Sequence, residues 1–185
     1  LYLFLILFTL QTPSQADDIR DFQIEGMSVG DSALDYIDKS EIIEGINPDY
    51  PNSKKFGRFF KKFPNSIYEG TQLHVKVNDP KFIIYSISGV IFFENNMKAC
   101  NDKRKEIFKE MTEVISGKTE DVGSQKHIDK EGDLRSITYA QYIKVNGGFV
   151  DFVCTDWTKK YNSTDSLKVI ITTTEFDEWL HKEAF

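Results

Sequence analysis

The sequence has few of the residues that build metal or thiol sites, with three histidines and two cysteines in 185 residues. No His-x-x-x-His or Cys-x-x-Cys spacing occurs, so nothing in the local sequence supports a zinc site. No glycine-rich phosphate loop precedes a predicted helix, and no Gly-x-Ser-x-Gly sequence marks a hydrolase nucleophile. We therefore expect no metal, no cofactor and no catalytic residue that the sequence alone identifies.

An excess of positive charge is also missing, because the formal net charge at pH 7 is −6. Dedicated nucleic-acid-binding domains carry a net basic footprint, so we expect no nucleic acid as a partner. This leaves a protein, an envelope component or a small molecule as the expected partner, with peripheral membrane contact as a further alternative.

Long apolar runs are absent as well, and the chain opens with an uncharged apolar segment, residues 1–10. It is too short to cross a bilayer, which needs about 20 residues. Ser14 and Ala16 are small residues at the spacing of a secretory cleavage site. The sequence predicts a signal peptide over residues 1–16, clipped at its N-terminus. Residues 17–185 are then a single domain that is periplasmic or secreted.

Two cysteines in an exported chain predict one disulfide, between Cys100 and Cys154. Cys100 falls on the apolar face of a predicted helix, and Cys154 falls on one face of a predicted strand. A bridge from helix to sheet is therefore geometrically possible. Two buried free thiols are the alternative.

Apolar periodicity predicts an α+β fold after a short helical N-terminal segment. Asn146-Gly147 between two apolar runs is the strongest hairpin signal. The order β-β-α-β-β-β-α favours an antiparallel sheet of about five strands with helices packed on one face. Residues 118–135 are polar and are predicted to form a long loop. The predicted strands are 71–77, 82–93, 137–145, 149–157 and 167–173, and the predicted helices are 29–37, 39–46, 95–116 and a last one that begins near Thr174.

One segment, residues 54–63, combines phenylalanines with cations. At 100° per residue its phenylalanines fall in one stripe, which predicts a short amphipathic helix. Such a helix can bind anionic lipid headgroups at a membrane surface. It can equally pack its apolar face into the core of its own domain. The phenylalanines are Phe56, Phe59, Phe60 and Phe63, and the cations are Lys54, Lys55, Arg58, Lys61 and Lys62.

Several short motifs resemble those of an uncharacterised family of small exported proteins from marine bacteria. They are residues 22–32 (FQIEGMSVGDS), residues 82–93 (FIIYSISGVIFF), Cys100 at the start of the long helix, and residues 154–157 (CTDW). That family has no known activity, so the resemblance implies no catalytic residue and no cofactor. The first motif is also similar to the start of small lipoproteins that help to assemble outer-membrane barrels, but this chain lacks their lipidated cysteine.

These observations predict an exported, non-catalytic binding or interaction domain. The alternative is a small exported enzyme, such as a hydrolase, with its site near residues 118–135. A concave pocket that holds His127 beside an acid or a cysteine would favour the enzyme. A flat apolar patch or an exposed phenylalanine stripe would favour the binding domain.

Overall fold

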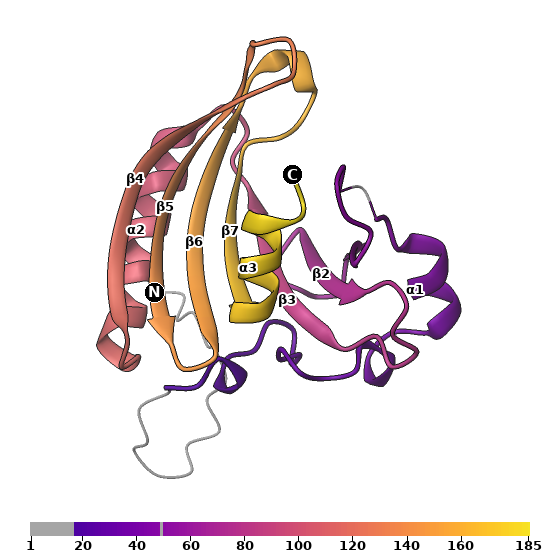
Figure 1. Cartoon of the computed structure of the whole chain (residues 1–185). Coiled ribbons are helices and arrows are strands. Elements are labelled where there is room, and N and C mark those ends of the chain that lie inside the picture. Colours follow the sequence, from indigo (N-terminus) through magenta and orange to yellow (C-terminus); the bar gives the residue numbers. More distant parts are fainter. Residues whose placement is uncertain (1–16, 49) are drawn as a thin grey trace.

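The computed structural model describes residues 17–48 and 50–185, so the predicted signal peptide lies outside the described residues. Within these residues the chain is α+β, and a single antiparallel sheet of seven strands runs in the order β1-β2-β3-β7-β6-β5-β4 (Figure 1). The expected antiparallel sheet is confirmed, but the expected number of about five strands was too low. The strands are β1 Phe56–Lys61, β2 Gly70–Lys76, β3 Ile84–Phe92, β4 Lys118–Ile128, β5 Leu134–Val145, β6 Gly148–Trp157 and β7 Ser166–Thr173.

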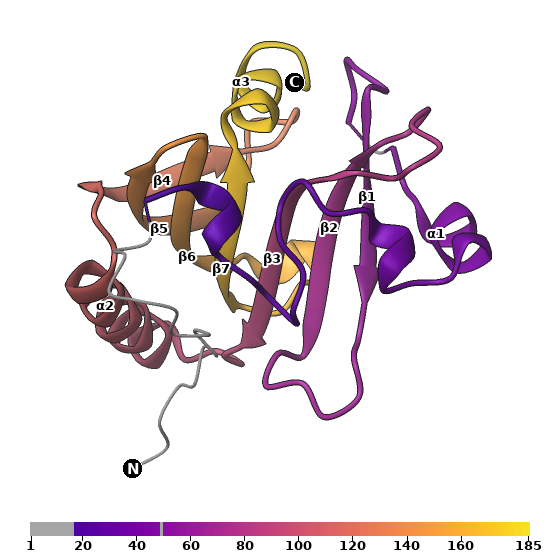
Figure 2. The ribbon, with the colours of Figure 1, turned by 90° about the horizontal axis from the view of Figure 1, so that it is seen from below.

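The helices do not share one face of the sheet, which corrects the expected arrangement. Helix α2 (Met97–Val114) packs on β5, β6 and β7, whereas α3 (Thr174–Lys182) packs on β3, β6 and β7 from the other side (Figure 2). The short α1 (Lys39–Gly45) lies against the edge strand β1. No described helix has the length and apolar character needed to cross a membrane.

Two predicted segments have a different structure from the one expected. Residues 54–63 do not form a helix, because residues 56–61 are strand β1, which pairs with β2. Residues 118–135 do not form a long loop, because β4 occupies residues 118–128 and β5 begins at Leu134. The helix expected over 29–37 is reduced to a single 3-10 turn at Ala33–Asp35.

The main core lies on the α2 face of the sheet. Alternate residues of the central strands point into it, including Ile87, Val150 and Ile171, and the N-terminal segment covers the part that α2 leaves open. A second, smaller core under α3 contains Phe56 and Trp179. Because the two faces are covered so unequally, the α3 face keeps an open region.

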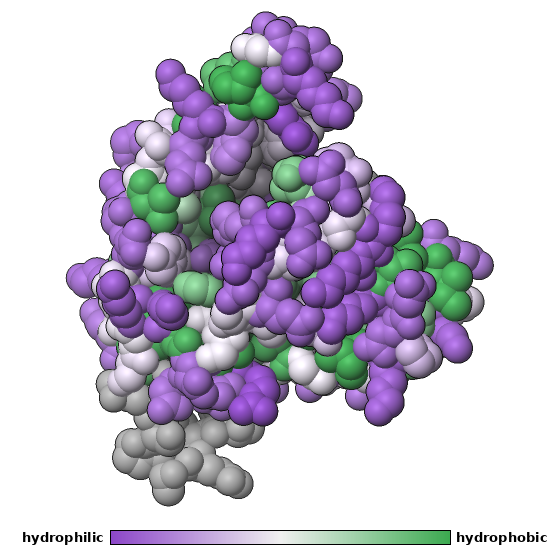
Figure 3. Space-filling model, viewed as in Figure 1, coloured by the Kyte–Doolittle hydropathy of each residue, from purple (hydrophilic) through white to green (hydrophobic). Residues whose placement is uncertain are grey.

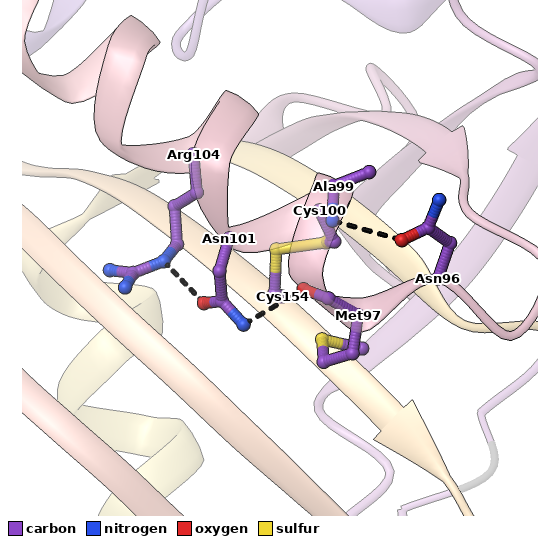
Figure 4. Close-up of a disulfide and its surroundings, with 7 residues drawn as sticks. All are labelled: Asn96, Met97, Ala99, Cys100, Asn101, Arg104 and Cys154. Carbon is purple, nitrogen blue, oxygen red and sulfur yellow. Dashed lines mark hydrogen bonds between the residues drawn. A yellow bond between two sulfur atoms is a disulfide. The ribbon is translucent and has the colours of Figure 1, made fainter.

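The disulfide between Cys100 and Cys154 is present and joins α2 to β6 within the main core (Figure 4). Asn96 caps the helix one turn before this bridge, since its side-chain oxygen accepts a hydrogen bond from the Ala99 N–H at 3.1 Å. The predicted helix-to-sheet link is therefore confirmed, and it anchors the N-terminal end of α2 to the sheet.

Candidate functional site

A cavity of about 640 Å³ opens on the α3 face of the sheet. In Figure 3 this face is hollowed below the tip of the β4–β5 hairpin. The volume falls within the range of small-molecule sites, about 300–1,000 Å³. The cavity is lined by Tyr50, Pro51, Arg58, Gln72, His74, Ser86, Ser88, Lys130, Arg135, Asp151, Lys168, Ile170, Thr172, Phe176, Asp177, Leu180 and Phe185.

The floor consists of two neighbouring rows of paired strand residues. One row runs across β1, β2, β3 and β7, and the other runs across β2, β3, β7 and β6. On each of β2, β3 and β7, the residue in one row lies two positions along the strand from the residue in the other row. The side chains of both rows therefore point to the same face of the sheet, the one opposite the main core. The first row is Arg58, His74, Ser86 and Thr172, and the second is Gln72, Ser88, Ile170 and Asp151.

Small hydroxyl side chains in the middle of this floor leave space for the cavity above them. Ser86 and Ser88 are buried on β3, and the Ser86 hydroxyl shares a 2.8 Å hydrogen bond with that of Thr172. On the core face of the same strand Ile87 is buried as well. The alternation of serine and isoleucine on β3 therefore separates a polar cavity floor from an apolar core.

Hydrogen bonds connect four polar side chains of the cavity lining, in the order Lys168, Gln72, His74 and Tyr50. The Lys168 ammonium donates to Gln72 Oε1 at 3.3 Å, which turns the Gln72 amide nitrogen toward His74 Nε2, also at 3.3 Å. The amide nitrogen can only donate, so His74 Nε2 accepts, and the ring proton is assigned to Nδ1. The Tyr50 hydroxyl lies 2.8 Å from the same Nε2 atom.

His74 is neutral in this position. Burial lowers its pKa to about 3, and the neighbouring positive charges of Lys168 and Arg58 act in the same direction. Its ring is packed against Phe176, with 4.6 Å between the ring centroids. Nδ1 is buried and has no hydrogen-bond partner among the described residues. His74 therefore acts as a neutral, positioned acceptor and not as a cation.

Acidic groups lie on the α3 side of the cavity. Burial, reinforced by the negative charge of Asp177, raises the pKa of Asp151 to about 7, and His181 partly opposes this rise. The Asp177 carboxylate lies 3.4 Å from His181 Nδ1 on the next turn of α3. Burial therefore favours the protonated form of the Asp151 carboxyl up to near-neutral pH.

The cations predicted as one basic surface lie on different parts of the structure. Within strand β1, Arg58 points to the cavity, whereas Lys61 points to the other face and pairs with Glu41 of α1 at 2.6 Å. Lys54 donates to the Pro48 carbonyl at 2.7 Å, and Lys55 lies 3.5 Å from Glu175. Lys62 is exposed. Binding of these cations to an anionic membrane remains a prediction, without the helix that suggested it.

The phenylalanines of the same segment are also divided. Phe56 and Phe59 are both buried, but on opposite faces of the sheet, whereas Phe60 is 51% exposed. Phe63 is partly buried against the main core. They form neither a single core stripe nor a continuous exposed patch.

The arrangement that would favour an enzyme near residues 118–135 is not present among the described residues. His127 borders a hollow of about 200 Å³ with Arg135, Thr138 and Trp157, and neither an acid nor a cysteine lines it. Its Nε2 atom hydrogen-bonds to the Thr138 hydroxyl at 2.9 Å, and Cys154 is in the disulfide. Nowhere in residues 17–48 and 50–185 do three His, Cys, Asp or Glu side chains meet as a metal site.

The cavity residues were missed because their sequence signal is weak. Alternation along β2 places Gln72 and His74 opposite the apolar Leu73 and Val75, which is the typical pattern of a solvent-exposed face. The same pattern recurs on β3 and β7, with Ser86 and Ser88 on one strand and Lys168 on the other. This face becomes a cavity because α3 and the segment that contains Tyr50 and Pro51 pack over it.

Comparisons with family models, with curated proteins and with solved structures found no match to this chain. The geometry of the α3 face therefore carries the functional argument alone. It defines the class of site as a polar-floored, apolar-walled cavity on an antiparallel sheet.

Proposed function

We propose that this chain is an exported, non-catalytic binding domain that holds a small organic molecule in the cavity on the α3 face of its sheet. The observation that carries the proposal is the cavity itself, about 640 Å³ in volume, with polar groups converging on its floor. Pockets of this size and mixed lining are typical of small-molecule sites. Phe176 and Leu180 of α3 supply an apolar wall, and Ile170 an apolar part of the floor, on which such a ligand can pack.

Export is supported by the disulfide between Cys100 and Cys154. Structural disulfides form and persist mainly in oxidising compartments such as the periplasm and the extracellular space. The predicted signal peptide over residues 1–16 points to the same compartments. In such a compartment the domain would meet its ligand outside the cytosol.

A cavity-filling variant tests the binding function. Ile170 lies in the middle of the floor, so Ile170→Trp should fill the cavity from below. We expect the purified protein to gain thermal stability with members of a small-molecule library, and the Ile170→Trp variant to lose those gains while keeping its circular dichroism spectrum. Ile43→Trp, on an exposed position of α1, is the matched control. Gains that survive in Ile170→Trp would place binding elsewhere and contradict the proposal.

A second candidate function, a small exported hydrolase, is favoured by one observation. Asp151 faces the cavity with a pKa raised to about 7 and lies near a second carboxyl group, that of Asp177. Carboxyl pairs of this kind serve as general acid and base in several enzyme classes. A panel of nitrophenyl esters and glycosides tests this function. Turnover by the wild type that falls at least about a hundredfold in Asp151→Asn would favour the enzyme over the binding domain.

A further inference from the structure

The charge of the cavity is opposite to the charge of the chain. The chain carries a net charge of −6, whereas four cations and two acids are found among the described residues that line the cavity. One of those acids, Asp151, is partly protonated at neutral pH because its pKa is raised to about 7. A cavity that gathers positive charge in an acidic protein is complementary to an anionic ligand. The cations are Arg58, Lys130, Arg135 and Lys168, and the acids are Asp151 and Asp177.

Lys168 is the cation that the fold holds on the cavity floor. It lies on β7, which is the middle strand of the sheet, and its side chain is half-buried. Burial lowers the pKa of its ammonium group, and the charge of Arg58 lowers it further. Among the described residues its hydrogen bond goes to the neutral amide of Gln72, and Arg58, not a carboxylate, is the charged group that acts on it.

A half-buried, partly desolvated cation of this kind costs stability unless an anion compensates it. The Gln72–His74–Tyr50 chain holds its hydrogen-bond partner in place and adds no negative charge. The fold therefore keeps at the cavity floor an ammonium group that a ligand anion can neutralise, and a charge-assisted hydrogen bond would form there.

The two acids limit the ligand to one anionic group. Asp177 and the ionised fraction of Asp151 lie on the α3 side of the same cavity, where they would repel a second negative charge. The rest of the lining includes Phe176 and Leu180 of α3 and Ile170 of the floor, which suit an apolar body. The lining thus matches a molecule with one charged end and an apolar remainder.

From this arrangement we infer that the cavity binds a small organic monoanion whose anionic group pairs with Lys168 and whose apolar body packs on Phe176 and Leu180. The inference rests on the proposed function and adds the chemical class of the ligand and the residue that selects it. Arg58, on the edge strand β1 of the same floor, adds to the positive electrostatic potential at Lys168.

Three probes that differ mainly in charge test the inference by calorimetry: phenylacetate, phenylacetamide and phenethylammonium. We expect the wild type to bind phenylacetate at least about tenfold more tightly than the neutral amide, and the cation most weakly. Lys168→Met should abolish the preference for phenylacetate. Lys105→Met, an equal change of charge at an exposed position of α2 on the opposite side of the sheet, should preserve it.

A second measurement separates ligand selection from a structural role. Since Lys168 is a partly desolvated cation without an anionic partner among the described residues, ligand-free Lys168→Met should unfold at the same or a higher denaturant concentration than the wild type. A loss of stability in Lys168→Met would show a structural lysine and overturn the inference. Should that variant fail to fold, Lys168→Gln provides the same comparison.

The remaining outcomes are also decisive. Equal binding of phenylacetate and phenylacetamide, tightest binding of the cation, or an unchanged preference in Lys168→Met would each overturn the assignment of a monoanion site. Absence of binding by all three probes would overturn it as well. The proposed binding function fails on a different result, namely ligand responses that persist when Ile170→Trp fills the cavity.

Discussion

His74 and Asp151 are two ionisable groups on one cavity floor whose pKa values move in opposite senses. Burial lowers the pKa of His74 to about 3 and raises that of Asp151 to about 7. Both shifts disfavour the charged form, so both groups tend to be neutral in the folded protein. Their effects on stability therefore oppose each other over part of the pH scale.

The direction of each effect follows from proton binding. An unfolded histidine titrates at about pH 6.5, so between about pH 3 and 6.5 the unfolded state binds more protons at His74, and stability falls as the pH falls. An unfolded aspartate titrates at about pH 3.9, so between about pH 4 and 7 the folded state binds more protons at Asp151, and stability falls as the pH rises. Between about pH 4 and 6.5 the two contributions partly cancel.

Single variants should reveal each contribution. Asp151→Asn leaves His74 unopposed, so we expect its stability to rise with pH between about 4 and 6.5 more steeply than that of the wild type. His74→Gln should show the reverse, a stability that falls as the pH rises through the same range. Urea unfolding at several pH values measures both slopes. The groups that face Asp151 are Asp177 and His181 of α3 and Tyr142 of β5. Parallel slopes in the two variants would show that these neighbours dominate the titration instead.

At the scale of elements, strand β1 shows why a short pattern can mislead. Phe56, Phe59, Phe60 and Phe63 have helical spacing, but six residues of this segment pair with β2 and alternate between the two faces of the sheet. Ten residues seldom form a stable helix without a partner, whereas β2 offers a complete edge of hydrogen-bonding groups. Pairing with β2, a long-range contact, therefore determines the structure of this segment, and the local sequence pattern carries no information about that contact.

Two neighbouring phenylalanines of β1 should therefore respond differently to truncation. Phe59 is 3% exposed and belongs to the main core, so Phe59→Ala should cost about 3–5 kcal/mol of unfolding free energy. Phe60 is 51% exposed and its ring covers Gly70, so Phe60→Ala should cost less than about 1 kcal/mol. Chemical denaturation of both variants measures the difference, and a helical stripe would instead make the two costs similar.

Other elements could be predicted because their signals are local. The Asn146-Gly147 turn joins β5 to β6 where the hairpin signal placed it, and Gly89 on β3 allows the close approach of the Tyr68 ring. Strand β4 could not be predicted in this way, because nearly all its residues are exposed. An edge strand with solvent on both faces carries no apolar alternation.

For the whole molecule, the disulfide is the covalent link between the α2 layer and the sheet. It joins positions 54 residues apart, and in the chain-entropy model a loop of that size contributes about 4 kcal/mol of stability. We expect the double variant Cys100→Ala, Cys154→Ala to unfold at a lower urea concentration by about that free energy. Added reductant should shift the wild type in the same direction and leave the double variant unchanged. Equal midpoints with and without reductant would contradict this prediction.

The disulfide could be predicted from the sequence and the cavity could not, and the reason is physical. The disulfide needs only two cysteines on an apolar helix face and an apolar strand face, and both faces can be recognised from periodicity. The cavity depends on which side of the sheet α3 and the Tyr50 segment cover, and that depends on long-range packing. Lys168 and His74 were therefore visible as polar strand residues but not as parts of one site.

The position of Phe185 has a practical consequence for any assay of this domain. The Asn52 N–H donates to the Ala184 carbonyl at 3.2 Å, and the Phe185 ring at the cavity rim lies 5.7 Å from that of Tyr50. Peptide fused behind Phe185 would emerge at the mouth of the cavity and would compete with a small solute for entry. An affinity handle placed ahead of Asp17, which bonds to Asn146 at the β5–β6 turn, avoids that obstruction.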